Sequence, residues 1–80
     1  MNDKIRTILK EHARLAIDPA ALKDDDDLYE SGMTSHASVN VMLALEGEFD
    51  VEFPDRMLQR GVFRSVASIC AAIEELTQGR

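Results

Sequence analysis

Ser35 and His36 are adjacent residues whose types suggest nucleophilic chemistry, because a serine hydroxyl attacks only when a base activates it. The nucleophile elbow of hydrolases places glycine two residues before and two residues after the serine. Those positions hold Met33 and Ala37 here. Consecutive side chains on a helix point about 100° apart, so His36 is poorly placed to take a proton from Ser35. We therefore predict no catalytic residue, and a chain that is not an enzyme.

Four consecutive aspartates, Asp24–Asp27, suggest a calcium site. The EF-hand loop needs glycine at its sixth position and glutamate at its twelfth. Counted from Asp24, these positions hold Tyr29 and Ser35, so the pattern fails. The two histidines and the single cysteine are not at metal-ligand spacing either. They are His12, His36 and Cys70. We predict no metal site, and we expect His12 and Cys70 to pack on apolar helix faces.

A different chemistry for Ser35 follows from its place at the start of an apolar helix. Thr34 or Ser35 supplies a hydroxyl N-cap for a helix that runs to about residue 49. The unpaired N–H groups and the positive end of the helix dipole favour an anionic group on a hydroxyl there. Ser35 therefore suits a phosphate-linked group, although a simple cap fits the same position and position alone does not decide.

The other predicted elements come from apolar spacing and from helix breakers. A first helix is expected over residues 3–16, with Asp3 as N-cap and with Asp18-Pro19 ending it. Residues 18–34 show no sustained period and are expected to form a long surface loop. Three apolar side chains should anchor this loop, namely Leu22, Leu28 and Tyr29.

Beyond residue 49 we expect an extended connector over residues 50–54 and then a short helix that begins near Pro54 and is capped by Gly61. Ser65 should cap a last helix with one apolar stripe. The sequence thus predicts an all-α fold, a bundle of four helices of which three are long and one is short. Residues 1–80 are expected to form a single domain.

Composition narrows the class of protein. The chain has 80 residues, of which 45% are hydrophobic and 30% charged, which is typical of a small globular domain with one modest core. It holds no apolar run of about 18 residues and no signal-peptide pattern, so we expect no membrane association. A single cysteine excludes an internal disulfide and favours a reducing compartment. We expect a cytoplasmic monomer.

The charge pattern bears on partners. Residues 18–55 carry eleven acidic side chains and one basic side chain, whereas both ends of the chain are net positive. An acidic middle argues against nucleic acid, whose binders must neutralise phosphates. It favours partners with basic surfaces, although solubility alone would also explain it.

Two stretches of the chain resemble the acyl carrier protein family, which includes peptidyl and aminoacyl carrier proteins. Residues 28–35 read Leu-Tyr-Glu-Ser-Gly-Met-Thr-Ser, and residues 42–54 read Met-Leu-Ala-Leu-Glu-Gly-Glu-Phe-Asp-Val-Glu-Phe-Pro. The family shows a glycine shortly before an Asp-Ser-Leu motif, then an apolar helix ending in glutamate and phenylalanine, then a Val/Ile-x-Ile/Phe-Pro segment. The second stretch matches in the correct register from Ser35, and the resemblance extends over about residues 3–77.

The resemblance implies a carrier function. Ser35 matches the serine that receives 4'-phosphopantetheine from coenzyme A, in a magnesium-dependent step run by a separate phosphopantetheinyl transferase. The thiol of the arm would hold an acyl or aminoacyl group as a thioester and deliver it to acyl-acceptor enzymes. The helix after Ser35 would be the recognition surface, and a groove between this helix and the last one would shelter apolar cargo. Gly32 would make the close turn before the serine.

The chain departs from the family at positions beside the serine. Thr34 replaces the usual aspartate, His36 the usual leucine, and Asn40 and Gly47 stand where relatives often carry acids. We therefore predict a specialised carrier with a dedicated loading ligase, and favour an amino acid:carrier protein ligase over polyketide or lipid systems. The predicted partner surface consists of Thr34, His36, Asn40, Leu43, Glu46 and Gly47. The alternative is a small acidic helical interaction module without a prosthetic group.

Overall fold

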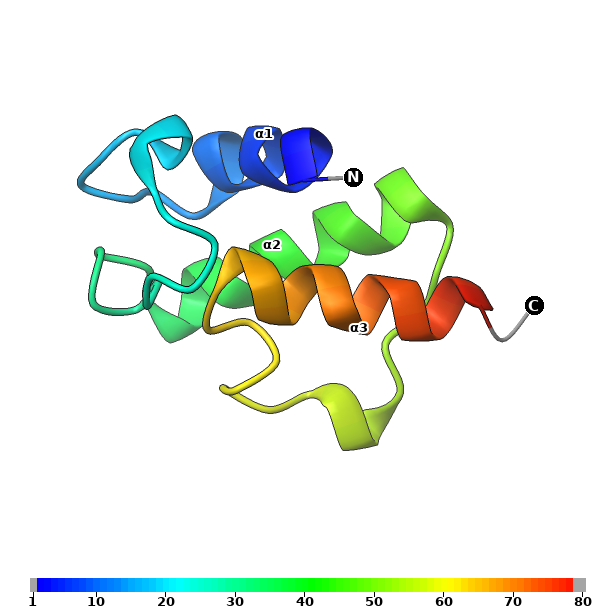
Figure 1. The fold of residues 1–80 in the computed structure, drawn as a ribbon. Helices are drawn as coiled ribbons and strands as arrows, with labels where there is room; N and C mark the ends of the chain where they lie inside the picture. Colours follow the sequence, from blue (N-terminus) through cyan, green and yellow to red (C-terminus); the bar gives the residue numbers. More distant parts are fainter. Residues whose placement is uncertain (1, 79–80) are drawn as a thin grey trace.

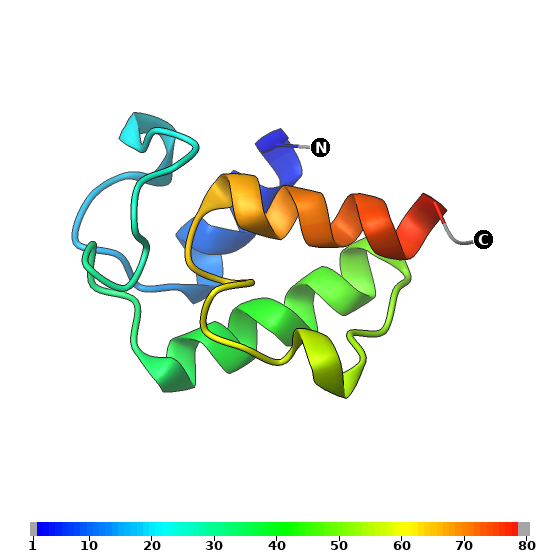
Figure 2. The ribbon, with the colours of Figure 1, turned by 60° about the horizontal axis from the view of Figure 1, so that its bottom comes forward.

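The computed structural model describes residues 2–78, and within that range the fold is all-α, as predicted. Its elements are α1 (Asn2–His12), the 3₁₀ turn η1 (Pro19–Ala21), α2 (Ser35–Phe49), the 3₁₀ turn η2 (Asp55–Met57) and α3 (Val66–Gln78). Figure 1 shows α1 above α2 and α3, and α1 packs against both. The segment that joins α2 to α3 passes back alongside α2 (Figure 2).

The first helix is shorter than predicted. It begins at Asn2, so Asp3 lies in the first turn, and it ends at His12 instead of residue 16. Arg14 adopts a left-handed backbone conformation with φ of 55°, which ends the helix. The N–H of Ala16 then donates to the carbonyl of Ser31 at 3.0 Å instead of to a helical acceptor. A contact with a distant loop thus replaces the last turn that the apolar spacing predicted.

The predicted short helix after α2 is also shorter than expected. It is the three-residue turn η2, whose closing bond runs from the N–H of Leu58 to the carbonyl of Asp55 at 3.0 Å. Leu58 has ψ of 62°, outside the helical region, so the helix does not continue to a cap at Gly61. The connector over residues 50–54 has no regular structure, as predicted.

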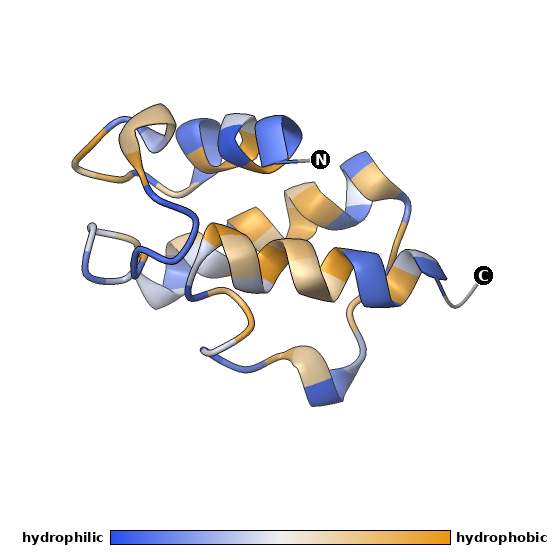
Figure 3. Cartoon of the chain, viewed as in Figure 1, coloured by the Kyte–Doolittle hydropathy of each residue, from blue (hydrophilic) through white to orange (hydrophobic). Residues whose placement is uncertain are grey.

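Arg6 holds the long loop between α1 and α2 against the first helix. Its guanidinium donates to the carbonyls of Pro19 and Leu22, the latter at 2.8 Å, and to the carboxylate of Asp24 at 2.6 Å. The side chain of Arg6 is only 20% exposed, so these charge-assisted bonds are partly shielded from water. A loop rich in aspartate therefore has a fixed path, and Figure 3 shows its hydrophilic stretch next to η1.

The core is aliphatic and draws on every helix. The largest fully buried side chains are Ile5, Leu9, Leu28, Val41, Leu45, Val66, Ile69 and Ile73. Leu28 and Leu22 are buried and Tyr29 is half-buried, which confirms the predicted anchors of the loop. Phe53 and Phe63 meet edge to face with ring centroids 5.3 Å apart. Because α1, α2 and α3 all insert side chains into this core, the start of α2 is held on a rigid base.

Candidate functional site

Ser35 is the first residue of α2, and its neighbour Thr34 is the N-cap. Thr34 has an extended backbone, and its hydroxyl accepts a hydrogen bond from the N–H of Ala37 at 3.0 Å. Ser35 is exposed, and its hydroxyl makes no hydrogen bond within the described residues 2–78. The two interpretations of this position are thereby separated. Thr34 caps the helix, and the hydroxyl of Ser35 is available for chemistry.

Gly32 shapes the turn that leads into α2. Its φ is +115°, a conformation that L-residues with a side chain rarely adopt. A Cβ atom at this position would also lie 3.3 Å from the backbone nitrogen of Ala16. The next residue, Met33, is buried, and its N–H donates to the carbonyl of Leu28 at 3.0 Å. The predicted close turn at Gly32 is confirmed, and it places Ser35 just outside the core.

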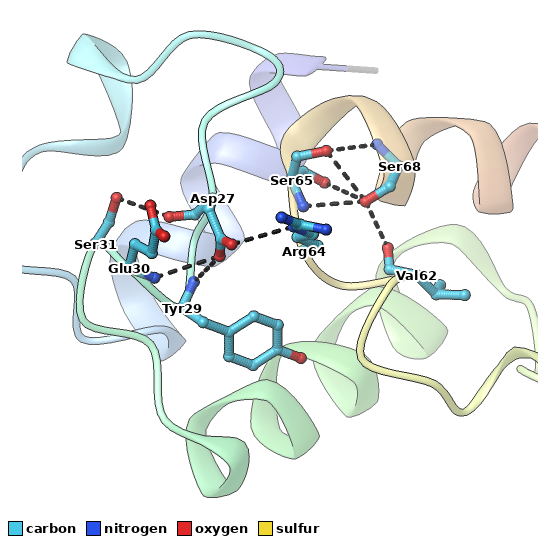
Figure 4. Close-up of polar contacts among 8 residues, drawn as sticks. All are labelled: Asp27, Tyr29, Glu30, Ser31, Val62, Arg64, Ser65 and Ser68. Atoms are coloured by element: carbon cyan, nitrogen blue, oxygen red, sulfur yellow. Dashed lines mark hydrogen bonds and ion pairs between the residues drawn. The ribbon is translucent and has the colours of Figure 1, made fainter.

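Asp27 connects the loop before Ser35 to the segment before α3 (Figure 4). One carboxylate oxygen accepts the N–H groups of Tyr29 at 2.9 Å and Glu30 at 3.3 Å, and the other accepts Nε of Arg64 at 3.1 Å. The N–H of Leu28 donates to the carbonyl of Arg64 at 2.7 Å beside it. The aspartate run is therefore part of the scaffold of the site.

These contacts change the acidity of Asp27. Desolvation raises the pKa of its carboxyl group. The N–H groups of Glu30 and Tyr29 and the guanidinium of Arg64 lower the pKa, and together they outweigh the desolvation. The net result is a pKa below the usual value for aspartate, so the group is ionised at neutral pH.

A pair of serines fixes the other side of this junction, as Figure 4 also shows. The N–H of Ser68 donates to Oγ of Ser65 at 3.1 Å, and the N–H of Ser65 donates to Oγ of Ser68 at 3.0 Å. Oγ of Ser68 in turn donates to the carbonyl of Val62 at 2.8 Å. Ser65 is thus confirmed as the cap of α3, and the reciprocal bonds hold the end of the preceding segment in place.

A groove of about 430 Å³ lies beside Ser35. One wall comes from α2 and the other from residues 58–63, with Tyr29 at the loop end. Its lining residues are Tyr29, Ser35, Ser38, Val39, Met42, Leu58, Gln59, Arg60 and Phe63. The resemblance implied a groove between α2 and the last helix. This groove instead opens between α2 and the segment before α3, and no residue of α3 lines it.

The predicted partner residues occupy two kinds of place. Most of them are exposed, namely Thr34, His36, Asn40, Leu43 and Gly47. Glu46 is half-buried, and its carboxylate accepts the N–H of Phe53 at 2.9 Å, which ties the connector to α2. Its role within the fold is thus structural.

Sequence reasoning missed part of the exposed apolar surface near the groove. Leu43 is 56% exposed, and Val39 and Leu58 are 49% and 47% exposed. We call these three residues the apolar patch. Leu43 belongs to the predicted partner surface. Val39 and Leu58 were not predicted as site residues, because their side chains are of the same type as the buried core residues. Tyr29 and Arg60, which also line the groove, were equally unmarked as site residues.

Metal and thiol chemistry find no support in the described part of the chain. Among residues 2–78, no group of three or more His, Cys, Asp or Glu side chains is arranged to hold a metal ion. Burial raises the pKa of the Cys70 thiol, and a hydrogen bond to Glu74 raises it further, so the thiol is a poor nucleophile. None of the described helices is long and apolar enough to cross a membrane.

Comparison with known proteins shows the family of the chain. A family model described as the phosphopantetheine attachment site matches residues 3–73. The aminoacyl carrier protein of Agrobacterium fabrum is 39% identical over 80 residues, covering 100% of this chain and 96% of the relative.

Two solved structures are also similar. One is the carrier protein from Agrobacterium tumefaciens in complex with an engineered Bradyrhizobium japonicum glycine:[carrier protein] ligase and AMP. It has a TM-score of 0.83 and 41% identity, and the match covers 98% of this chain and 99% of that chain. The other is a B. japonicum glycine:[carrier protein] ligase complexed with glycylated carrier protein. This match has a TM-score of 0.76 and 28% identity, and it covers 89% of this chain and 95% of the matched chain.

The chain therefore belongs to the phosphopantetheine-binding carrier proteins. The cofactor of this class is 4'-phosphopantetheine, attached covalently. The structure fits such a group, because an exposed serine hydroxyl stands at a helix N-terminus next to a groove that is large enough to receive part of an extended arm.

Proposed function

We propose that Ser35 carries the 4'-phosphopantetheine arm and that the thiol of the arm holds an aminoacyl group as a thioester. A separate phosphopantetheinyl transferase would join the hydroxyl oxygen of Ser35 to the phosphorus of the phosphopantetheine group. The pyrophosphate bond of coenzyme A would break, adenosine 3',5'-bisphosphate would leave, and the hydroxyl proton would be lost. A dedicated amino acid:carrier protein ligase would load the thiol, and acyl-acceptor enzymes would receive the cargo. The chain itself would make and break no bond. Residues 1–80 would act as one carrier domain in the cytoplasm.

The observation that carries the attachment proposal is the division of labour at the start of α2. Thr34 satisfies the helix end with its own hydroxyl, which leaves the hydroxyl of Ser35 exposed and without a partner among residues 2–78. Gly32 and the buried Met33 hold the turn before it. A nucleophile presented in this way is accessible to an external enzyme, as transfer from coenzyme A requires.

The aminoacyl cargo is supported by the relatives. One is named an aminoacyl carrier protein, and two similar structures are carriers bound to glycine:[carrier protein] ligases. The surface near Ser35 is consistent with such a partner. The apolar patch is exposed surface that a partner would bury. The exposed residues around it on α2 include the uncharged Asn40 and Gly47. Recognition would then depend on apolar contact more than on acidic side chains.

The attachment is tested by incubating the purified chain with coenzyme A, magnesium and a promiscuous phosphopantetheinyl transferase, and recording its intact mass. We expect wild type to gain the mass of one phosphopantetheine group and Ser35→Ala to gain nothing. Ser38→Ala is the matched control, because Ser38 lines the same groove one turn later, and it should be modified like wild type. Wild type that stays unmodified with several transferases would instead point to the arm-free interaction module.

A further inference from the structure

Arg60 lines the same groove as Ser35, from the opposite wall. Its guanidinium carbon lies 3.9 Å from the centre of the Tyr29 ring, which is a cation–π contact. The position of Tyr29 is itself fixed, because its N–H donates to Asp27 and the ring points away from Asp27 towards the region between α2 and the segment before α3 (Figure 4). The charge of Arg60 therefore lies over the ring of Tyr29, at the groove that Ser35 also lines.

Three other arginines of the described residues form ion pairs with carboxylates. Arg6 binds Asp24, Arg56 binds Glu75 and Arg64 binds Asp27. Within residues 2–78, no carboxylate lies within ion-pair distance of Arg60, although this chain is strongly acidic. The Arg60 guanidinium lies over the Tyr29 ring and makes no hydrogen bond within residues 2–78, so its N–H groups are available. The N–H edge of a guanidinium matches two oxygens of a phosphate group.

We propose that Arg60 binds the phosphodiester of the arm on Ser35 and positions the arm along the groove. This inference rests on the attachment proposed above. The negative charge of the phosphodiester would balance the positive charge of Arg60 across the groove. The pantetheine part would then lie between Val39 and Met42 on one wall and Leu58 on the other, which offer apolar surface to its methyl groups. Arg60 is a positioning residue in this account, with Tyr29 as its platform.

The experiment compares fully modified wild type, Arg60→Gln and Arg56→Gln by ³¹P NMR and by relaxation of the isotope-labelled amides of the arm. Arg56→Gln removes the same charge from the same segment, and Arg56 lines a different surface pocket. We expect Arg60→Gln to move the phosphorus resonance towards that of free phosphopantetheine. The amides of the arm should become as mobile as those of free phosphopantetheine. Arg56→Gln should match wild type in both measurements.

Two further samples separate charge from stacking. Arg60→Lys keeps the charge but loses the planar fork and most of the stacking, so it should restore only part of the phosphorus shift. In wild type, raising NaCl to about 1 M, where the Debye length is about 3 Å, should move the resonance towards that of Arg60→Gln. This salt arm needs no variant and remains valid if a substitution disturbs folding.

The outcomes are distinguishable. Identical phosphorus shifts and arm mobility in modified wild type and Arg60→Gln would overturn the inference and leave the attachment intact. An equal effect of Arg56→Gln would also overturn it, because it would show a general effect of net charge. A wild-type chain that accepts no arm would instead contradict the attachment at Ser35.

Discussion

The carboxylate of Asp27 shows at the residue scale how one side chain orders the surroundings of Ser35. It accepts two backbone N–H groups from its own loop and the guanidinium of Arg64 from the segment before α3. Each of these donors favours the ionised carboxylate, and together they lower its pKa despite desolvation. The loop that precedes Ser35 is thus joined to the segment before α3 by an ion pair that needs the ionised carboxylate of Asp27.

This linkage gives a pH dependence with a definite sign. The folded-state pKa of Asp27 lies below the unfolded value of about 3.9, so its contribution to stability is present above that pH. The contribution is lost as the pH falls through the folded-state pKa. We expect Asp27→Asn to lower the melting temperature at pH 7, and the difference from wild type to shrink below about pH 4.

Thermal unfolding followed by circular dichroism at pH 7 and near pH 3 measures both effects. Asp25→Asn is the matched control, since Asp25 belongs to the same run of aspartates and its side chain makes no hydrogen bond or ion pair within residues 2–78. It should leave the melting temperature nearly unchanged. A difference between wild type and Asp27→Asn that is the same at both pH values would contradict this role.

At the scale of elements, one glycine precedes α2 and another lies within it, and their environments differ. Gly32 precedes the helix with φ of +115°, and a Cβ there would lie 3.3 Å from the backbone of Ala16. Gly47 lies inside the helix, and a Cβ there would meet nothing within 4 Å. We expect Gly32→Ala to lower the free energy of unfolding by about 1–3 kcal/mol, the usual cost of a strained backbone conformation.

Gly47→Ala should raise the free energy of unfolding by about 0.5–1 kcal/mol, because alanine is the better helix former and the site has space. Urea denaturation of the two variants and of wild type provides the measurement. If Gly32→Ala left the free energy of unfolding unchanged or raised it, the turn at Gly32 would not depend on the conformation that only glycine adopts easily.

The sequence predicts the middles of these elements better than their ends. The apolar spacing around Ile5, Val41 and Ile69 locates all three helices, because each helix must bury one face against the others. The end of α1 depends on the bond from Ala16 to Ser31, which joins residues that no local pattern connects. The same holds for η2, where the backbone leaves the helical region at Leu58.

The site was predictable to a similar degree. Ser35 follows from its position and from the register of the family motif. The groove does not, because its walls come from α2 and from residues 58–63, which meet only after the chain has folded back. Arg60 carries no sequence signal, since it lies outside both stretches that resemble the family. Tyr29 lies within the first stretch, but nothing in the sequence marks its ring as part of a groove.

At the scale of the whole molecule, the charge pattern has a second meaning. The acidic middle of the chain suggested a surface for basic partners. Two of its aspartates instead pair with arginines from the net-positive ends, Asp24 with Arg6 at 2.6 Å and Asp27 with Arg64 at 3.1 Å. Part of the charge asymmetry therefore holds the chain together. What α2 presents near Ser35 is the exposed apolar surface of Val39 and Leu43.

This surface suits a partner that recognises shape and apolar contact, as expected for a dedicated loading ligase. The most direct measurement is the intact mass of the phosphopantetheine-bearing chain after incubation with ATP, glycine and a glycine:[carrier protein] ligase, with fatty acid and an acyl ligase in a parallel sample. We predict a gain of one glycyl group that hydroxylamine removes, and no gain in Ser35→Ala. A chain that the glycine ligase leaves unmodified while the fatty acyl ligase loads it would contradict the account.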